Sequence, residues 1–153
     1  MLDSKTSKGI PYIESEEIIA RAVCKKMNCE QIHMASDDAH VDRLFYRNGQ
    51  LVAVGEIKSR NMTIEELESH GSYLITENKI AVGCALAGLM GVPFMLFVKL
   101  LKSDIIVYWL ICNGNGELKV HYDKEVTKTR ATVNGGQAQR MNAFIDLSQM
   151  KTL

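Results

Sequence analysis

Residues 41–58 read VDRLFYRNGQLVAVGEIK and contain the clearest local structural signal in the chain. Two runs rich in β-branched and aromatic residues, 41–47 and 51–58, stand on either side of Asn48-Gly49. This dipeptide between two such runs is the strongest short marker of a β-hairpin, because both residues tolerate the positive φ of a tight turn. The stretch therefore predicts two antiparallel strands, the second ending in Glu56-Ile57-Lys58.

The residues before the hairpin predict a helix and a short strand. Ser15 is a good N-cap, and Glu16 and Glu17 favour the first turn of a helix that ends near Asn28. Apolar residues recur on one face of this helix. They are Ile18, Ile19, Ala22, Val23 and Met27. A short strand over 31–35 follows.

After the hairpin, Thr63 is expected to cap a second helical region, which breaks around Gly71 and resumes from Leu74 to Met90. Continuous apolar runs at 93–101 and 105–112 are typical of strands buried on both faces of a sheet. The long helix would then connect the third strand to a neighbouring parallel strand.

This order predicts an α/β fold with a mixed β-sheet flanked by helices. We expect a single domain over 1–153, with a flexible arm over 1–10, a core over about 15–112 and a C-terminal extension over 113–153. The extension has weaker signals. They indicate a strand over 117–122, a turn at 134–136, and a last helix or an irregular tail over 137–149.

Charge and hydropathy exclude several classes of protein. The 18 basic and 18 acidic residues sum to zero, which argues against a histone-like binder that relies on a bulk positive field. The run 80–98 is uncharged and long enough for a bilayer, but Pro93 and the glycines within it favour a helix followed by a buried strand. An integral membrane protein is the alternative, which purification without detergent would exclude.

Four cysteines, Cys24, Cys29, Cys84 and Cys112, occur without a preceding signal-peptide pattern. We therefore expect reduced, buried thiols in a cytoplasmic protein of bacterial or phage origin, and no zinc site.

The polar end of the second hairpin strand points to chemistry. Glu56 and Lys58 are two residues apart, so they share a face of the strand, and burying both is costly unless a function needs them. An exposed salt-bridged strand end is the ordinary explanation. The presence of Asp42 on the preceding strand favours a functional site over this explanation. The two carboxylates, together with the backbone carbonyl of Ile57, can hold Mg²⁺. A lysine beside such a metal can orient or help deprotonate water, which suits phosphodiester hydrolysis.

On these residues the chain resembles the PD-(D/E)XK nuclease superfamily, which has the restriction-endonuclease-like fold. The resemblance covers roughly 15–112, whose α-β-β-β-α-β order is that of the superfamily core. It implies that Asp42 and the Glu56-Ile57-Lys58 motif form the catalytic site, with Mg²⁺ or Mn²⁺ as cofactor and DNA as substrate. It also implies a further acid on the first helix, for which Glu16 is preferred and Glu17 is the substitute.

Two positions depart from patterns within the superfamily. Val41, not Pro, precedes Asp42, which is common among its members. Ser69 stands where the RecB-like branch has the Gln of its Gln-x-x-x-Tyr motif, so that branch is not expected.

The hairpin turn tests the metal site. A two-residue loop would pair Asp42 with Gly55 and place its side chain on the opposite face from Glu56. We therefore predict a three-residue loop over 47–49 with a bulge, or another odd-residue offset. In a plain two-residue hairpin without a bulge, Asp38 would replace Asp42.

Nucleic-acid contacts are expected from four basic residues, Arg60, Lys79, Lys128 and Arg130. Related nucleases often place polar residues of the long helix, here Thr76 and Lys79, against the active site. The segment 119–140 holds five basic and two acidic residues and can either bind phosphates or be an ordinary polar surface. His70 is a further candidate, although a lone His near a helix break is more often structural or exposed.

We expect a metal-dependent nuclease that hydrolyses DNA, and an endonuclease in particular. A homodimer or higher homo-oligomer would let two sites address two strands, and residues 82–90 could supply its interface, although burial in the core is the simpler explanation. The alternative is a catalytically inactive nuclease-like domain that binds nucleic acid or a protein partner.

Overall fold

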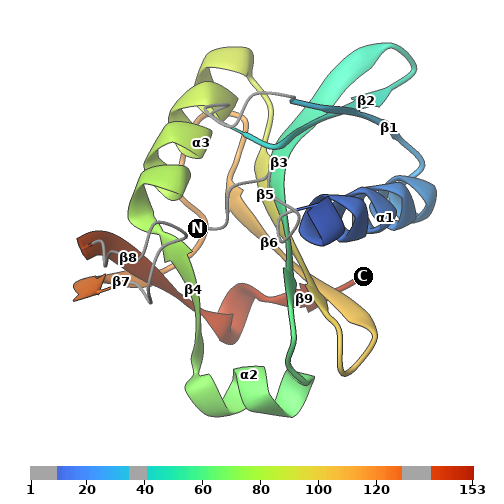
Figure 1. Cartoon of the computed structure of the whole chain (residues 1–153). Helices are drawn as coiled ribbons and strands as arrows, with labels where there is room; N and C mark the ends of the chain where they lie inside the picture. Colours follow the sequence, from blue (N-terminus) through green and yellow to red (C-terminus); the bar gives the residue numbers. More distant parts are fainter. Residues whose placement is uncertain (1–9, 35–40, 129–138) are drawn as a thin grey trace.

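The computed structural model describes residues 10–34, 41–128 and 139–153. Its centre is a six-stranded sheet in the order β1-β2-β3-β5-β6-β9 (Figure 1). The strands are β1 (Glu30–His33), β2 (Arg43–Arg47), β3 (Gln50–Arg60), β5 (Phe94–Leu100), β6 (Ile105–Cys112) and β9 (Lys151–Thr152). Strands β3 and β5 are parallel and the other neighbours are antiparallel, which confirms the predicted mixed sheet and α/β class.

Helix α1 (Ile10–Met27) covers one face of this sheet. Its buried residues Ile19 and Val23 belong to an apolar cluster with Ile57 of β3 and Phe97 of β5. The helix begins before the predicted Ser15 and ends near the predicted Asn28. Only Ile19 and Val23 of the predicted apolar face are buried, whereas Ile18, Ala22 and Met27 are exposed. The buried face is completed by Ala20 and Cys24, so the predicted face was rotated from the one that packs on the sheet.

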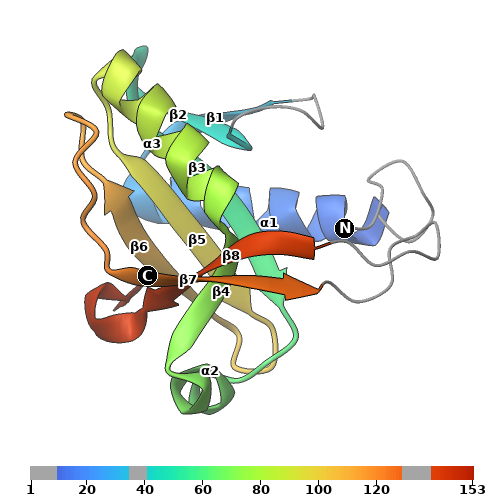
Figure 2. The same ribbon diagram turned by 90° about the vertical axis from the view of Figure 1, so that its left-hand side faces the viewer.

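The opposite face is covered by α2 (Ile64–His70), α3 (Glu77–Met90) and a second sheet, as Figure 2 shows. This sheet has the order β4-β8-β7, with β4 (Ser72–Thr76), β7 (Tyr122–Lys128) and β8 (Gln139–Asp146). Tyr73 of β4 packs on Trp109 of β6, with 5.4 Å between the ring centroids. This layer forms most of the main core.

Three sequence predictions need correction here. Residues 72–76 form β4 rather than the start of the long helix, which begins at Glu77. The predicted strand over 117–122 is replaced by β7 from Tyr122, and the predicted helix or tail over 137–149 contains β8 and a short 3-10 helix, Leu147–Gln149. In each case pairing between distant segments determines the strand. The predicted turn at 134–136 lies outside the described residues.

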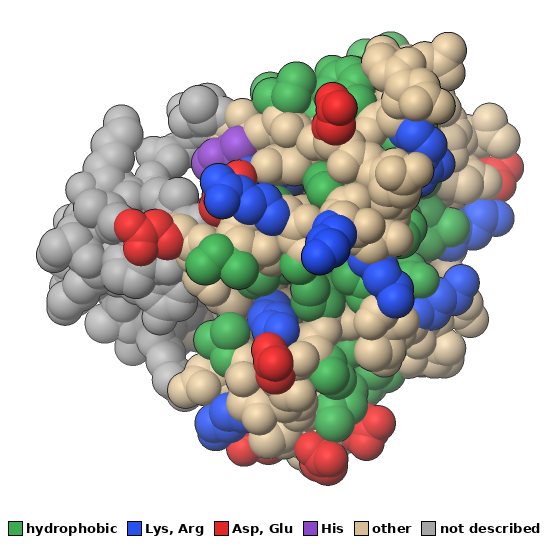
Figure 3. Space-filling view, turned by 90° about the vertical axis from the view of Figure 1, so that its right-hand side faces the viewer, with side chains coloured by type: hydrophobic (Ala, Val, Ile, Leu, Met, Phe, Trp, Pro, Cys, Tyr) green, Lys and Arg blue, Asp and Glu red, His purple; other side chains and the backbone are tan. Residues whose placement is uncertain are grey.

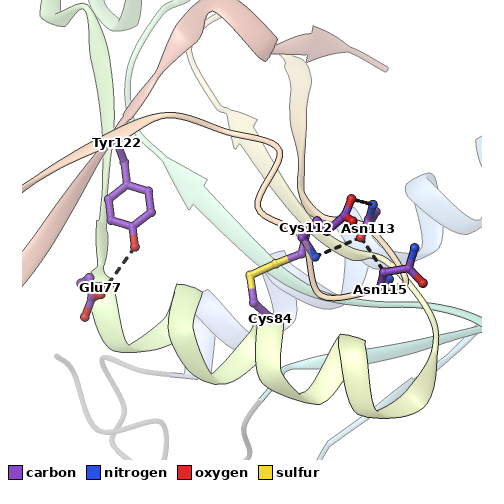
Figure 4. The surroundings of a disulfide bond; sticks show 7 residues. Glu77, Cys84, Cys112, Asn113, Asn115 and Tyr122 are labelled. Atoms are coloured by element: carbon purple, nitrogen blue, oxygen red, sulfur yellow. Dashed lines mark hydrogen bonds between the residues drawn. A yellow bond between two sulfur atoms is a disulfide. The ribbon is translucent and has the colours of Figure 1, made fainter.

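The cysteines also differ from expectation. Cys84 of α3 and Cys112 of β6 form a disulfide (Figure 4). Cys24 and Cys29 are free thiols. Beyond Cys112, Asn113 closes a turn by accepting hydrogen bonds from the backbone N–H groups of Asn115 and Glu117. The disulfide forms because α3 crosses the end of β6, a contact that spacing along the chain does not reveal.

Among the described residues, no helix combines the length and apolar character that crossing a bilayer requires. The uncharged run 80–98 is divided between α3 and β5, with Gly91 in a left-handed C-cap at φ 68°.

Gly83 sets how closely α3 approaches the sheet. A Cβ atom at this position would lie 2.3 Å from a ring carbon of Phe94, which is fully buried in β5. Lys79 lies one helical turn before Gly83, so the close approach also brings Lys79 toward the sheet.

Gly83→Ala should lower the free energy of unfolding by about 1–3 kcal/mol, because the methyl group overpacks against the Phe94 ring. The better helix propensity of Ala, up to about 1 kcal/mol, acts in the opposite direction. Urea unfolding followed by circular dichroism measures the change. A double-mutant cycle with Phe94→Leu should show coupling between the two sites, and additive effects would contradict this explanation.

Candidate active site

The β2–β3 hairpin places the two predicted acids on one face of the sheet. Asn48 and Gly49 form a two-residue turn with φ of 51° and 75°, so the predicted three-residue loop is wrong. However, a bulge follows: Tyr46 pairs with Leu51 and Phe45 with Ala53, which leaves Val52 as the extra residue. The alternative prediction of another odd-residue offset is thus confirmed.

This bulge determines the direction of Asp42. Arg43 pairs with Gly55 instead of Val54, and its side chain points to the α1 face, where it contacts Glu17. The preceding Asp42 and the following Glu56 therefore both point to the α3 face. The backbone N–H of Asp42 donates to the Gly55 carbonyl at 3.1 Å.

Glu56 is the centre of a charged cluster. Its carboxylate is fully buried and lies 3.6 Å from the ammonium of Lys58 and 3.1 Å from that of Lys79 on α3. Asp42 joins through Lys58 at 3.7 Å and accepts a hydrogen bond from the backbone N–H of Ile57 at 3.4 Å. The structure therefore brings Asp42, Glu56, Lys58 and Lys79 together from two strands and a helix.

The two carboxyl groups differ in their affinity for protons. Burial raises the pKa of Glu56 to about 8, and the nearby Asp42 carboxylate acts in the same direction. Burial would also raise the pKa of Asp42, but its hydrogen bond with Glu56 and the charges of Lys58 and Lys79 outweigh it and lower that pKa. Of the two carboxyl groups, Glu56 therefore has the higher affinity for a proton.

The surroundings of Lys58 stabilise its charged, protonated form. Burial alone would lower its pKa, but the carboxylates of Asp42 and Glu56 outweigh burial, so the pKa of Lys58 is raised.

The two acids of α1 have different environments. Glu16 is half-buried, and burial raises its pKa while the charges of Lys58 and Asp42 also act on it, so it borders the cluster. Glu17 instead pairs with Arg43 at 2.8 Å and accepts a hydrogen bond from Gln31. This placement favours Glu16 over Glu17 as the additional acid.

Arg60 and Tyr73 extend the cluster along β3. Arg60 follows Glu56 and Lys58 on the same strand face, and its guanidinium lies 5.5 Å from the Tyr73 ring centroid. The Tyr73 hydroxyl is buried and has no hydrogen-bond partner among the described residues. Tyr73 was not predicted as a site residue, although it stands at the Tyr position of the Gln-x-x-x-Tyr pattern. It reaches the cluster because residues 72–76 form β4, which was not predicted either.

Other predicted contacts lie elsewhere. Lys128 is exposed at the end of β7, His70 is exposed in the last turn of α2, and Thr76 is the N-cap of α3 without a side-chain hydrogen bond. Arg130 and the substitute acid Asp38 lie outside the described residues. On the face seen in Figure 3, Lys and Arg side chains are interspersed with apolar and polar groups rather than gathered into one patch.

The cluster fits a hard divalent cation in its chemistry. Within the described ranges no three His, Cys, Asp or Glu side chains converge, so protein side chains would supply two carboxylates only. Glu56 Oε2 is buried, has no hydrogen bond in the described part of the chain, and lies 3.6 Å from the Lys58 ammonium. A buried carboxylate oxygen without a hydrogen bond, beside a second carboxylate, suits Mg²⁺ binding.

Comparison with known proteins supports this interpretation. A family model described as "Phage putative PDDEXK endonuclease" matches residues 11–148. The chain belongs to this family. A search of curated proteins finds no match.

Membership of the PDDEXK endonuclease family confirms the superfamily predicted from Asp42, Glu56 and Lys58. The match extends beyond the expected core of 15–112 and includes β7 and β8. The strands of the second sheet therefore lie within the matched region. The roles of the individual residues stay predictions.

Proposed function

We propose that this PDDEXK family member is a metal-dependent endonuclease that hydrolyses DNA phosphodiester bonds. The observation that supports the proposal best is the convergence of Asp42 and Glu56 on the single ammonium of Lys58, at 3.7 and 3.6 Å. Family membership supports the nuclease class.

Mg²⁺ or Mn²⁺ would be held by the carboxylates of Asp42 and Glu56 with the backbone carbonyl of Ile57. When bound, the cation supplies charge neutralisation for the scissile phosphate and acidification of a water molecule. Asp42 holds its negative charge in the metal-free protein, because its pKa is lowered. Glu56 must lose its proton before it can act as a ligand.

The remaining residues would handle water and phosphate. Lys58 lies between the two acids and can hold the attacking water by donating hydrogen bonds. Glu16 at the border of the cluster can accept a proton from that water, because burial raises its pKa. Lys79 and Arg60 flank Glu56 and Lys58 and can bind the phosphates on either side.

Incubation with circular and linear DNA tests the proposal. We expect supercoiled plasmid to be nicked or linearised in Mg²⁺ and left intact in EDTA, since a closed circle has no ends for an exonuclease. Linear, single-stranded and four-way-junction DNA in parallel identify the preferred substrate. Binding of DNA without cleavage of any of these would instead support the inactive nuclease-like domain.

A further inference from the structure

A second feature borders the charged cluster. A cavity of about 490 Å³ lies between the end of β3, α2 and β4. We call it the β4 pocket, and its walls include Arg60, Met62, Leu67, Tyr73, Leu74 and Phe144. Within its sheet β4 pairs only with β8, so its other edge is not covered by a strand of that sheet. The consecutive residues Ser72, Tyr73 and Leu74 of β4 all line the pocket, so both faces of the strand contribute to it.

The β4 pocket continues the line of the cluster. Glu56, Lys58 and Arg60 follow one another on one face of β3, with about 7 Å between successive Cα atoms. Arg60 belongs both to this row and to the pocket wall. Tyr73 forms another wall, and its unpartnered hydroxyl is close enough to Glu56 and Lys58 for their charges to act on it.

The lining has the chemistry that a nucleobase requires. Aromatic and aliphatic groups supply surfaces on which a planar base can stack, and each stacked base contributes measurably to affinity. Arg60 supplies a positive charge in the lining, and the lining contains no Asp or Glu. A phosphate attached to the base would therefore meet no carboxylate there, and the Arg60 guanidinium offers donors to it.

The walls of the pocket, rather than its volume, restrict the kind of DNA that fits. A volume of about 490 Å³ is in the range of small-molecule sites and accommodates a base, but a base within a double helix has both faces covered by its stacked neighbours. A base can enter only after it has left the stack, as in enzymes that flip nucleotides, or where it was never paired.

We propose that the β4 pocket binds an unpaired base next to the scissile phosphate, so that the preferred substrate is DNA with an unpaired nucleotide at the cleavage site. This inference rests on the proposed nuclease function. It specifies the substrate class: single-stranded ends, flaps and branches rather than uniform duplex.

The fluorescent base 2-aminopurine provides the test. Two DNAs would carry it, one in a single-stranded overhang beside a duplex and one paired within the duplex, with Ca²⁺ replacing Mg²⁺ to suppress cleavage. Leu74→Glu places a charge in the pocket at a side chain that is 44% exposed. The matched control is Leu118→Glu, at a leucine that is 48% exposed and lies outside the pocket.

Binding should quench the overhang base and leave the paired base unchanged. Leu74→Glu should weaken overhang binding about 10-fold and duplex binding less than about 2-fold, while Leu118→Glu should change neither. Leu74→Trp fills the cavity without adding charge and should produce the same selective loss, even if Leu74→Glu fails to fold. Equal losses on both DNAs, or no quenching of the overhang base, would overturn the inference.

Cleavage of the same DNAs in Mg²⁺ separates the two proposals. Cleavage without any effect of the Leu74 variants on overhang binding contradicts the pocket assignment and leaves the nuclease intact. Selective overhang binding without cleavage of any DNA supports the pocket and contradicts the nuclease.

Discussion

Glu56→Gln and Lys58→Ala should each reduce DNA cleavage by about 10²- to 10⁴-fold while leaving the fold intact. The first change removes a charged oxygen ligand from the buried cluster but keeps its volume. The second removes the ammonium that lies within 4 Å of both acids, at 3.7 and 3.6 Å. Initial rates of plasmid nicking measure the effect, and circular dichroism verifies the fold.

Matched controls are available on the surface. Glu125→Gln changes an exposed acid of β7, and Lys102→Ala changes an exposed lysine that pairs only with Glu66 among the described residues. Both should retain wild-type activity. Full activity of either cluster variant would exclude that residue from catalysis.

Metal affinity should depend strongly on pH. Glu56 has a pKa of about 8 in the metal-free protein, so below that pH each bound cation must displace a proton from it. The apparent dissociation constant should therefore rise by up to about tenfold per unit as the pH falls below 8, or about 50-fold between pH 8 and pH 6. Above about pH 9 the affinity should be nearly constant, because Glu56 is then almost fully ionised.

Titration calorimetry with Mn²⁺ in buffers of different ionisation enthalpy measures both the affinity and the number of protons released. We expect close to one proton per cation at pH 7 and fewer than half at pH 9. In Glu56→Gln the proton release should disappear. An affinity that is independent of pH would show that Glu56 is not a ligand.

The central sheet can be predicted because its signals are local. The apolar run 105–112 coincides with β6, and the run 93–101 contains β5. Thr63 caps α2 as expected, and the structure adds a full capping box with Glu66 three residues later. Each of these elements is specified by residues within or next to it.

The second sheet cannot be predicted in the same way. Residues 72–76 continue an apolar pattern into the long helix, and they form a strand only because Ser72–Thr76 pair with Asn142–Asp146. Tyr73 is consequently absent from the predicted site. The ion pair between Lys79 and Glu56 cannot be predicted from the sequence either, because it depends on how closely α3 packs on β5.

The acids of the site could be predicted only in part. Residue types and spacing are sufficient to nominate Asp42 and Glu56, but their shared face depends on whether an odd residue is accommodated in the hairpin. The sequence analysis placed that residue in the turn, whereas the structure places it at Val52. Asn48-Gly49 favours the two-residue turn strongly enough to move the irregularity into the strand.

Because of the bulge at Val52, the geometry of the proposed site depends on the number of residues in the hairpin as well as on the motif. Deleting one residue between Arg47 and Gly55 would leave every acid and lysine in place, yet turn the first acid to the opposite side of the sheet. Relatives with the same motif but the other parity of hairpin length would lose the paired carboxylates. Parity at this hairpin is therefore, alongside the motif, a condition for the paired carboxylates of the proposed site.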